Sequence, residues 1–143
     1  MTIAAILARK GDEVVTLSAG SRVGEAVAAL TRHRIGALPV VDDEERVIGI
    51  LSERDVIYCL ESHGVDALDL SIDKVMTSPP ITVTPDVPVI SALSQMSSKR
   101  VRHLPVIEGG RMIGLVSIGD LVAYRIARIE QEADAMRAYI QGT

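Results

Sequence analysis

The chain has 143 residues and a net charge of −4; 48% of its residues are hydrophobic and only 2% are aromatic. This length suits one compact domain, whose core must be built from Val, Ile, Leu, Ala and Met because Phe and Trp are absent. Nucleic-acid binding depends on basic surfaces and base stacking, so this composition argues against a nucleic-acid partner.

Cysteine usage and hydropathy indicate the compartment. Cys59 is the only cysteine, so no internal disulfide can form and a reducing compartment is expected. The first residues carry no positive region ahead of their short apolar run, which makes them a poor match to a signal peptide. No apolar run approaches the roughly 18–20 residues that span a bilayer. The sequence therefore predicts a cytoplasmic protein without membrane contact.

The chain contains an internal duplication. Residues 15–41 align with 81–107 without a gap, and 46–58 align with 111–123 after a turn that is one residue shorter. Roughly 12 of about 40 paired positions are identical, and most others exchange similar residues. The identical pairs include Thr16 with Thr82, Pro39 with Pro105, Ser52 with Ser117, and Asp55 with Asp120.

In chain order, the opening residues 2–11 form a lead-in that is expected to cap the sheet. Each copy then predicts a β-α-β-β-α unit. It begins with a short β-branched segment, at Val14–Leu17 and again at Ile81–Thr84. An amphipathic helix follows, with apolar residues three or four apart at Val23, Ala26, Val27 and Leu30, and at Val89, Ala92, Leu93 and Met96. Two short apolar runs then predict a hairpin, and a second helix begins at Ser52 and at Ser117.

The segment between the copies predicts a short helix at Ser71–Met76 and a break at Pro79-Pro80. One unit cannot cover its own sheet, whereas two units packed together can. We therefore expect an α/β (α+β) fold of two tandem β-α-β-β-α repeats related by pseudo-two-fold symmetry. The expected boundaries within the single module 1–143 are 4–63 for the first repeat, 70–124 for the second, and 125–143 for a helical extension.

The final helix is predicted from Gly119 to about Gln141, longer than the second repeat requires. Its apolar residues are spaced 4-3-4-3-4, which is a coiled-coil pattern. They are Val122, Ile126, Ile129, Ala133, Met136 and Ile140. One interpretation is that these residues pack on the same subunit. We favour a homodimer, because so long an apolar seam would otherwise stay exposed.

The two Leu-Pro-Val strands, two Gly-containing strands and two Ser-x-x-Asp turns resemble tandem cystathionine-β-synthase (CBS) domains, the pair called a Bateman module. The resemblance covers residues from about Ala4 to Tyr124. It implies a regulatory adenosine ligand, commonly AMP, ADP or ATP and sometimes NAD or S-adenosylmethionine. It also implies regulation of an attached or partner protein, without catalysis. No catalytic or transport domain accompanies the pair here, so we interpret the chain as a stand-alone, bacterial-type CBS pair.

The Ser-x-x-Asp turns have two interpretations. At a strand-to-helix junction this spacing is a capping box, which stabilises a helix start without any ligand. The resemblance implies in addition that Asp55 and Asp120 accept hydrogen bonds from ribose hydroxyls, with Ser52 or Ser117 serving a ribose or phosphate oxygen. Both roles can hold together.

The resemblance also implies two interleaved clefts, each taking Ser and Asp from one repeat and the first strand and Leu-Pro-Val strand from the other. Cleft one would contain Ser52, Asp55, Ile81, Thr82, Val83, Arg102, His103 and Pro105. Cleft two would contain Val15, Thr16, Leu17, Ala37, Pro39, Arg54, Ser117 and Asp120. Arg102 and His103 would hold phosphate in cleft one, and Arg54 in cleft two.

No catalytic or metal-binding pattern is visible in the sequence, so we expect neither an enzyme nor a metal protein. The interpretation is an adenine-nucleotide sensor that modulates an unidentified partner. Two alternatives stay open: an NAD(H)-binding redox sensor, and an interaction or scaffold protein with vestigial clefts.

Overall fold

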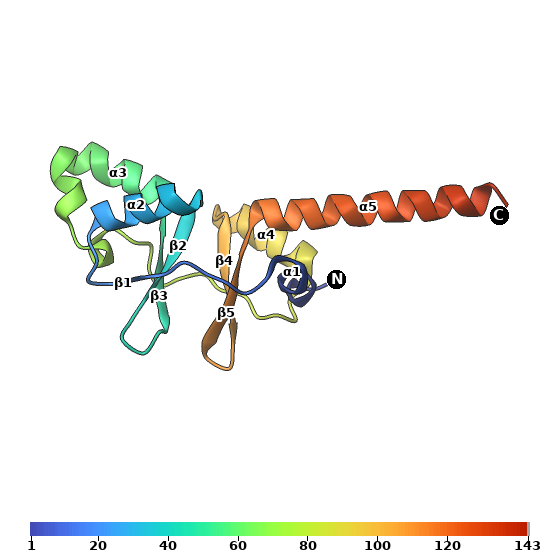
Figure 1. The fold of residues 1–143 in the computed structure, drawn as a ribbon, viewed down its shortest axis with the longest axis horizontal. Helices are drawn as coiled ribbons and strands as arrows, with labels where there is room; N and C mark the ends of the chain where they lie inside the picture. The colour runs from blue at the N-terminus through green and yellow to red at the C-terminus, as the bar shows by residue number, and fades with distance from the viewer. Residues whose placement is uncertain (143) are drawn as a thin grey trace.

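The structure is a computed structural model that describes residues 1–142 (Figure 1). The first repeat comprises β1 (Leu17–Ser18), α2 (Val23–His33), β2 (Ala37–Val41), β3 (Val47–Ser52) and α3 (Glu53–His63). The second comprises α4 (Val89–Lys99), β4 (His103–Glu108), β5 (Arg111–Ser117) and α5 (Ile118–Ile140). The lead-ins are α1 (Ile3–Lys10) before the first repeat, and the 3-10 helices η1 (Gly64–Asp69) and η2 (Ile72–Lys74) before the second. The mixed α+β class with two repeats and a long final helix is confirmed.

Each repeat contains a small sheet built on one antiparallel hairpin. In the first, β1 pairs in parallel with β2, and β2 pairs antiparallel with β3. In the second, β4 pairs antiparallel with β5. Figure 1 shows the two hairpins side by side at the centre of the molecule, with α2 and α3 beyond the first and α5 leading away from the second.

The opening strand of each repeat is shorter than the sequence predicts. The prediction of Val14–Leu17 was wrong in extent, because β1 covers only Leu17 and Ser18. The counterpart at Ile81–Thr84 is reduced to one parallel bridge between Val83 and Val106. Both segments lie at a sheet edge and pair on one side only, and Pro85 ends the second of them at once.

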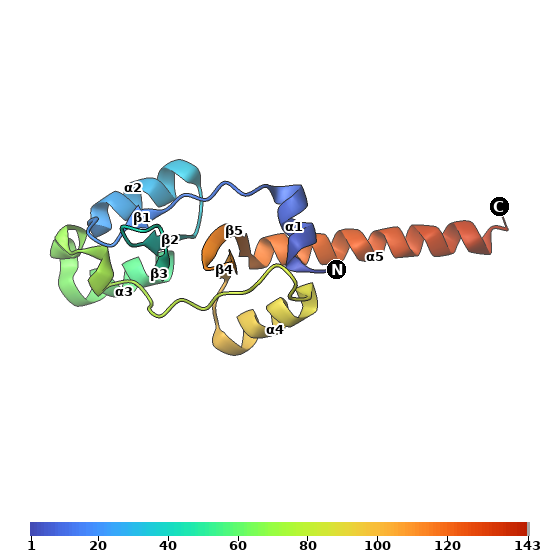
Figure 2. The ribbon, with the colours of Figure 1, turned by 90° about the horizontal axis from the view of Figure 1, so that it is seen from below.

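The lead-in α1 packs on the second repeat, not on the first repeat that follows it in the chain (Figure 2). Its Ile3 N–H donates to the Val87 carbonyl at 2.9 Å, and the Val89 N–H donates to the Met1 carbonyl at 3.0 Å. The Ile3 side chain is fully buried among residues of the second repeat. The start of α4 is therefore covered by the N-terminus of the chain.

The lead-in η2 makes the reciprocal contact with the first repeat. The Ile72 N–H donates to the Ser21 carbonyl at 2.8 Å, and the Val23 N–H donates to the Leu70 carbonyl at 2.9 Å. Ile72 is fully buried in the core of the first repeat. The predicted helix at Ser71–Met76 is therefore only the short 3-10 helix η2. Each repeat thus has its helix start covered by a lead-in, and these two contacts follow the pseudo-two-fold relation between the repeats.

Each repeat has its own aliphatic core. The first core contains Val23, Ala26, Ala29, Leu30, Leu38, Val40, Leu51, Val56 and Ile72. The second contains Ile3, Ile6, Val83, Val89, Ala92, Met96, Leu104, Val106, Val116 and Leu121. The positions predicted from three- and four-residue spacing supply three of the four core residues on α2 and all three on α4. The repeat boundaries stay a prediction, and Thr143, at the end of the predicted extension, lies outside the described residues.

A glycine in the second hairpin strand of each repeat makes room for a lead-in side chain. A Cβ added at Gly49 would lie 2.5 Å from Met76 Sδ and 3.0 Å from the Thr77 carbonyl oxygen. A Cβ added at Gly114 would lie 2.6 Å from Leu7 Cδ2. The lead-ins therefore pack closely over β3 and β5 because no side chain intervenes.

We predict that Gly49→Ala lowers the free energy of unfolding by about 1–3 kcal/mol, since the Thr77 backbone, which is hydrogen-bonded to Ile50, would have to shift to admit the new Cβ. Gly114→Ala should have a smaller effect, because its first contact is the end of a flexible Leu7 side chain. Urea unfolding measures both, with Gly20→Ala as the control because nothing lies within 4 Å of its added Cβ. Equal losses in all three variants would contradict this packing.

Candidate ligand-binding clefts

A cavity of about 730 Å³ lies between the two repeats, within the size range of small-molecule sites. One wall comes from β2, β3 and the first turns of α3, and the other from the end of α4 and the start of β4. The linker between the repeats closes a third side. The lining residues are Gly36, Ala37, Ile50, Ser52, Glu53, Arg54, Asp55, Ile57, Tyr58, Thr77, Pro80, Ile81, Lys99, Arg100, Val101, Arg102 and His103.

Ser52 and Asp55 form the predicted capping box at the start of α3. The Asp55 N–H donates to Ser52 Oγ at 3.3 Å, and the Ser52 N–H donates to Asp55 Oδ2 at 2.9 Å. Thr77 Oγ1 donates to Asp55 Oδ1 at 3.2 Å. Because a carboxylate oxygen has two lone pairs, Oδ1 can accept a further hydrogen bond from the cavity. The cap and a ligand role are therefore compatible.

Basic side chains dominate the charge around this cavity. Arg54 comes from α3, while Lys99, Arg100 and Arg102 come from the end of α4 and the segment before β4. Arg100 adopts the left-handed conformation, with φ of 57°, where the helix gives way to the strand. Glu53 is the acidic lining residue besides Asp55. The basic groups together can hold an anion larger than one carboxylate.

The structure brings together five of the eight residues predicted for cleft one: Ser52, Asp55, Ile81, Arg102 and His103. The other three, Thr82, Val83 and Pro105, are not among the lining residues. Val83 is buried, with its N–H donating to the Pro105 carbonyl at 3.0 Å. The backbone of Val83 therefore forms its hydrogen bonds with β4.

Ala37 and Arg54, which were predicted for cleft two, line this same cavity. Lys99, Arg100, Thr77 and Tyr58 also line it, and the sequence interpretation missed them. The sequence did contain a signal for the two basic residues, since Lys99 and Arg100 stand immediately before Val101 and Arg102 in the chain.

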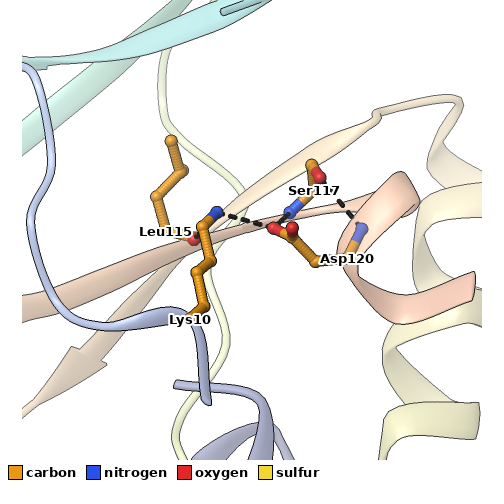
Figure 3. Close-up of polar contacts among 4 residues, drawn as sticks. All are labelled: Lys10, Leu115, Ser117 and Asp120. Carbon is orange, nitrogen blue, oxygen red and sulfur yellow. Dashed lines mark hydrogen bonds and ion pairs between the residues drawn. The ribbon is translucent and has the colours of Figure 1, made fainter. Parts of the chain in front are cut away.

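The second Ser-x-x-Asp turn forms the same capping box at the start of α5. The Asp120 N–H donates to Ser117 Oγ at 3.1 Å, and the Ser117 N–H donates to Asp120 Oδ2 at 2.9 Å. Here, however, a cation is already in place (Figure 3). Lys10, the last residue of α1, donates from Nζ to Asp120 Oδ2 at 2.6 Å and to the Leu115 carbonyl at 2.8 Å.

The ion pair with Lys10 sets the acidity of Asp120. Burial by itself raises the pKa of this carboxyl, but the hydrogen bond and charge of Lys10 and the hydrogen bonds from Ser117 outweigh burial. The pKa of Asp120 consequently lies below its ordinary value of 3.8. Asp120 is therefore ionised and paired at neutral pH.

The remaining residues predicted for cleft two belong to the first repeat. Pro39 is fully buried in β2 opposite Ile50. Val15 and Leu17 pack against the core of the first repeat, and Thr16 between them is half-buried. Within residues 1–142, the hydrogen bonds and ion pair of Asp120 are with Lys10 and Ser117 and not with these residues, so the second cleft stays a prediction.

His103 lies near charged groups from α1 and from both repeats. Partial burial lowers the pKa of His103 below its ordinary value of 6.5, and the Lys10 ammonium lowers it further. The carboxylates of Asp120 and Glu53 oppose this without overcoming it. The side chain is therefore mainly neutral at neutral pH, a form in which one ring nitrogen can donate a hydrogen bond and the other can accept one.

Two further properties bear on the kind of site. Within residues 1–142, no group of three or more His, Cys, Asp or Glu side chains is arranged to hold a metal ion. Across the same residues, no helix combines the length and the hydropathy that a membrane crossing requires.

The comparisons with known proteins identify the family. The CBS domain model matches residues 6–62 and again 72–127, so the chain belongs to the CBS-domain family, with two domains in tandem. The mitochondrial CBS domain-containing protein CBSX3 of Arabidopsis thaliana is 38% identical over 124 residues, which are 84% of this chain and 60% of that protein. The chain spans less than two thirds of the length of this and other curated relatives.

Solved structures agree with this assignment. The CBS-domain containing protein ATU1752 from Agrobacterium tumefaciens is 35% identical, with a TM-score of 0.84 over 87% of this chain and 92% of that one. The CBS domain protein PAE2072 from Pyrobaculum aerophilum, solved in complex with AMP, is 25% identical, with a TM-score of 0.75 over 84% of this chain and 89% of that one. The predicted tandem CBS pair is thereby confirmed.

The lowered pKa of His103 predicts a loss of stability in mild acid. Because the folded-state pKa lies below 6.5, the unfolded chain takes up this proton first as the pH falls. The His103 contribution to the free energy of unfolding is therefore complete above pH 6.5 and declines as the pH falls toward the folded-state pKa.

We expect His103→Gln to reduce the drop in unfolding free energy between about pH 7.5 and pH 5.5, measured by urea titration. His33→Gln is the matched control, because His33 is exposed on α2. An unchanged drop in His103→Gln would show that other groups carry the acid sensitivity.

Proposed function

We propose that this protein is a regulatory CBS pair that binds an adenosine-containing ligand, foremost AMP, ADP or ATP, between its repeats. The observation that carries the proposal is the cavity of about 730 Å³, which combines the Asp55 carboxylate with a basic wall. The AMP complex of the relative PAE2072 supports this ligand class. The bound ligand modulates a partner protein and the chain performs no chemistry of its own.

The proposed cavity has separate regions for the parts of such a ligand. Asp55 Oδ1 accepts from a ribose hydroxyl, since it retains accepting capacity beyond the Thr77 hydrogen bond. Arg102 and its basic neighbours hold the phosphates, because guanidinium groups bind phosphate through forked donors. Ile50, Ile81 and Val101 offer apolar surface for the adenine ring.

The regulatory step follows from where the ligand binds. A molecule that bridges both repeats stabilises whichever relative arrangement binds it better, by no more than its difference in affinity between the arrangements. NAD(H) carries the same ribose and phosphate groups and is the alternative ligand, which would make the protein a redox sensor. Failure of all these ligands to bind would favour the alternative of a scaffold with vestigial clefts.

The two clefts are proposed to be unequal. Within residues 1–142, the carboxylate of Asp55 accepts from the neutral groups of Ser52 and Thr77, whereas Asp120 is held by the Lys10 ammonium at 2.6 Å. A ribose at Asp120 must displace or share that cation. The Asp55 cleft therefore binds first.

We further propose a homodimeric protein that works in a reducing compartment such as the cytoplasm. Cys59 is free and buried, which suits a reducing environment. The apolar residues along α5 supply the dimer surface. Five of the six seam residues are exposed in a single chain: Val122, Ile126, Ile129, Met136 and Ile140.

Asp55→Ala and Arg102→Ala are each expected to weaken binding of the tightest adenosine ligand by roughly 10- to 100-fold, because each removes hydrogen bonds that involve a charged group. Isothermal titration calorimetry with AMP, ADP, ATP and NAD(H) measures this. Asp43→Ala is the control, because Asp43 is exposed in the turn between β2 and β3. Wild-type protein that binds none of the four ligands would contradict the proposed function.

Lys10→Met is expected to strengthen binding at the second cleft several-fold, because it frees Asp120 from its ion pair. The measurement is the affinity of the second calorimetric event, with Arg9→Met on the same helix as the control. Binding that is identical in Lys10→Met and wild type would show that the cleft inequality has another origin.

A further inference from the structure

Helix α5 extends well beyond the body of the protein. Figures 1 and 2 both show its C-terminal half leading away from the repeats as a single helix. The exposed fractions of its seam side chains are 42% for Val122, 51% for Ile126, 51% for Ile129, 57% for Met136 and 73% for Ile140. Because most of the stability of a helix in a protein comes from packing of its apolar face, this exposed face needs a covering surface.

The seam is distinct from the face that α5 presents to its own core. Leu121 is fully buried in the second core, and Tyr124 packs against that core. At 3.6 residues per turn, the direction of Leu121 and Tyr124 lies about 120° from the centre of the seam. The helix therefore packs against the second repeat with the face of Leu121 and Tyr124, and the seam lies on a different face.

We propose that the seam pairs with the same seam of a second copy as a parallel, in-register, two-stranded coiled coil. This inference rests on the proposed homodimer and adds its orientation and register. The seam residues occupy the two core positions of a heptad repeat. In the usual notation, Ile126, Ala133 and Ile140 are at position a, and Val122, Ile129 and Met136 are at position d.

The charges beside the seam specify the parallel orientation. Arg125 and Glu132 are at position g, and Glu130 and Arg137 are at position e. In a parallel pair, each g residue faces the e residue five positions later in the other chain. Arg125 then faces Glu130 of the second copy, and Glu132 faces Arg137, so symmetry gives four attractive pairs.

The antiparallel alternative aligns the apolar layers equally well but opposes like charges. Its full register places Val122 against Ile140 and Ile126 against Met136 of the second copy. This arrangement brings Glu130 near Glu130 and Glu132 near Glu132 at the centre of the pair. Charge complementarity therefore favours the parallel form.

The side chains are available for these contacts. Within residues 1–142, Arg125, Glu130 and Glu132 are exposed and none of them takes part in an ion pair of 4.0 Å or less. Arg137 contacts Asp134 on its own helix at 2.9 Å, and both side chains are more than 70% exposed. A pair so exposed is weak, so Arg137 can also reach a carboxylate on the second helix.

The attachment of the body is compatible with this pairing. Because each body lies about 120° from its seam, both bodies point away from the helix pair, on opposite sides of it. The two modules then sit at one end of the coiled coil, and the C-terminal ends of the two α5 helices lie together at the other end.

The first test is a charge exchange in the full chain, read as the dimer dissociation constant by sedimentation equilibrium at low salt. Arg125→Glu should weaken the dimer roughly ten-fold, because it replaces two attractive pairs by two repulsive ones. Adding Glu130→Arg should restore the wild-type constant to within about two-fold. Gln131→Glu, which adds a negative charge off the seam, is the control. Absence of rescue in the double variant would overturn the parallel orientation.

The second test is disulfide mapping in a Cys59→Ala background. Ile126→Cys combined with Met136→Cys should give 126–126 and 136–136 cross-links in the parallel form, identified in tryptic digests by mass spectrometry. In the antiparallel form the two Met136 positions lie about 15 Å apart along the axis, so 126–136 links would appear instead and overturn the proposal.

The outcomes separate this inference from the ones on which it rests. A dimer without charge rescue, or with 126–136 links, overturns only the parallel pairing. A trimer or tetramer overturns the two-stranded form. A monomer at all concentrations overturns the homodimer as well, and leaves ligand binding to be judged by calorimetry alone.

Discussion

The remaining structure depends on an exchange of lead-in segments, in which the lead-in that precedes each repeat packs against the other repeat. Ile3, near the start of the chain, is buried in the core of the second repeat, and Ile72, in the linker, is buried in the core of the first. Full burial of such a side chain contributes about 1.5–3 kcal/mol, so neither lead-in detaches without a large loss of stability. This exchange also places Lys10, the last residue of α1, against Asp120. One packing arrangement therefore supports both cores and gives Asp120 its ion pair.

Local and repeated features of the fold could be predicted from the sequence. The three- and four-residue spacing of apolar positions identified α2 and α4, and the long seam identified α5 to within one residue at each end. The capping boxes at Ser52 and Ser117 were visible because their partners stand only three residues away. These features could be predicted because the residues that determine a helix or its cap lie within a few positions of one another in the sequence.

Contacts between distant segments could not be predicted in the same way. Lys10 and Asp120 are 110 residues apart, and no pattern around Lys10 distinguishes it from an ordinary surface lysine. The placement of Arg54 and Ala37 beside Asp55 depends on how the two hairpins face each other, which the spacing of residues does not determine. Lys99 and Arg100 join this wall because the chain turns in the left-handed conformation at Arg100. Which residues line the cavity therefore depends on the tertiary arrangement of the two repeats.

The cavity, the basic wall and the two capped aspartates are the basis of the proposal that this module responds to a ligand held between its repeats. The most direct measurement of that proposal is native mass spectrometry of the purified protein during titration with AMP, ADP and ATP. The proposed function predicts that one adenosine ligand per chain binds first and that Asp55→Ala raises the concentration at which this adduct forms by roughly 10- to 100-fold. A wild-type spectrum without any bound nucleotide at saturating concentrations, or a first adduct that forms at the same concentration in Asp55→Ala, would contradict it.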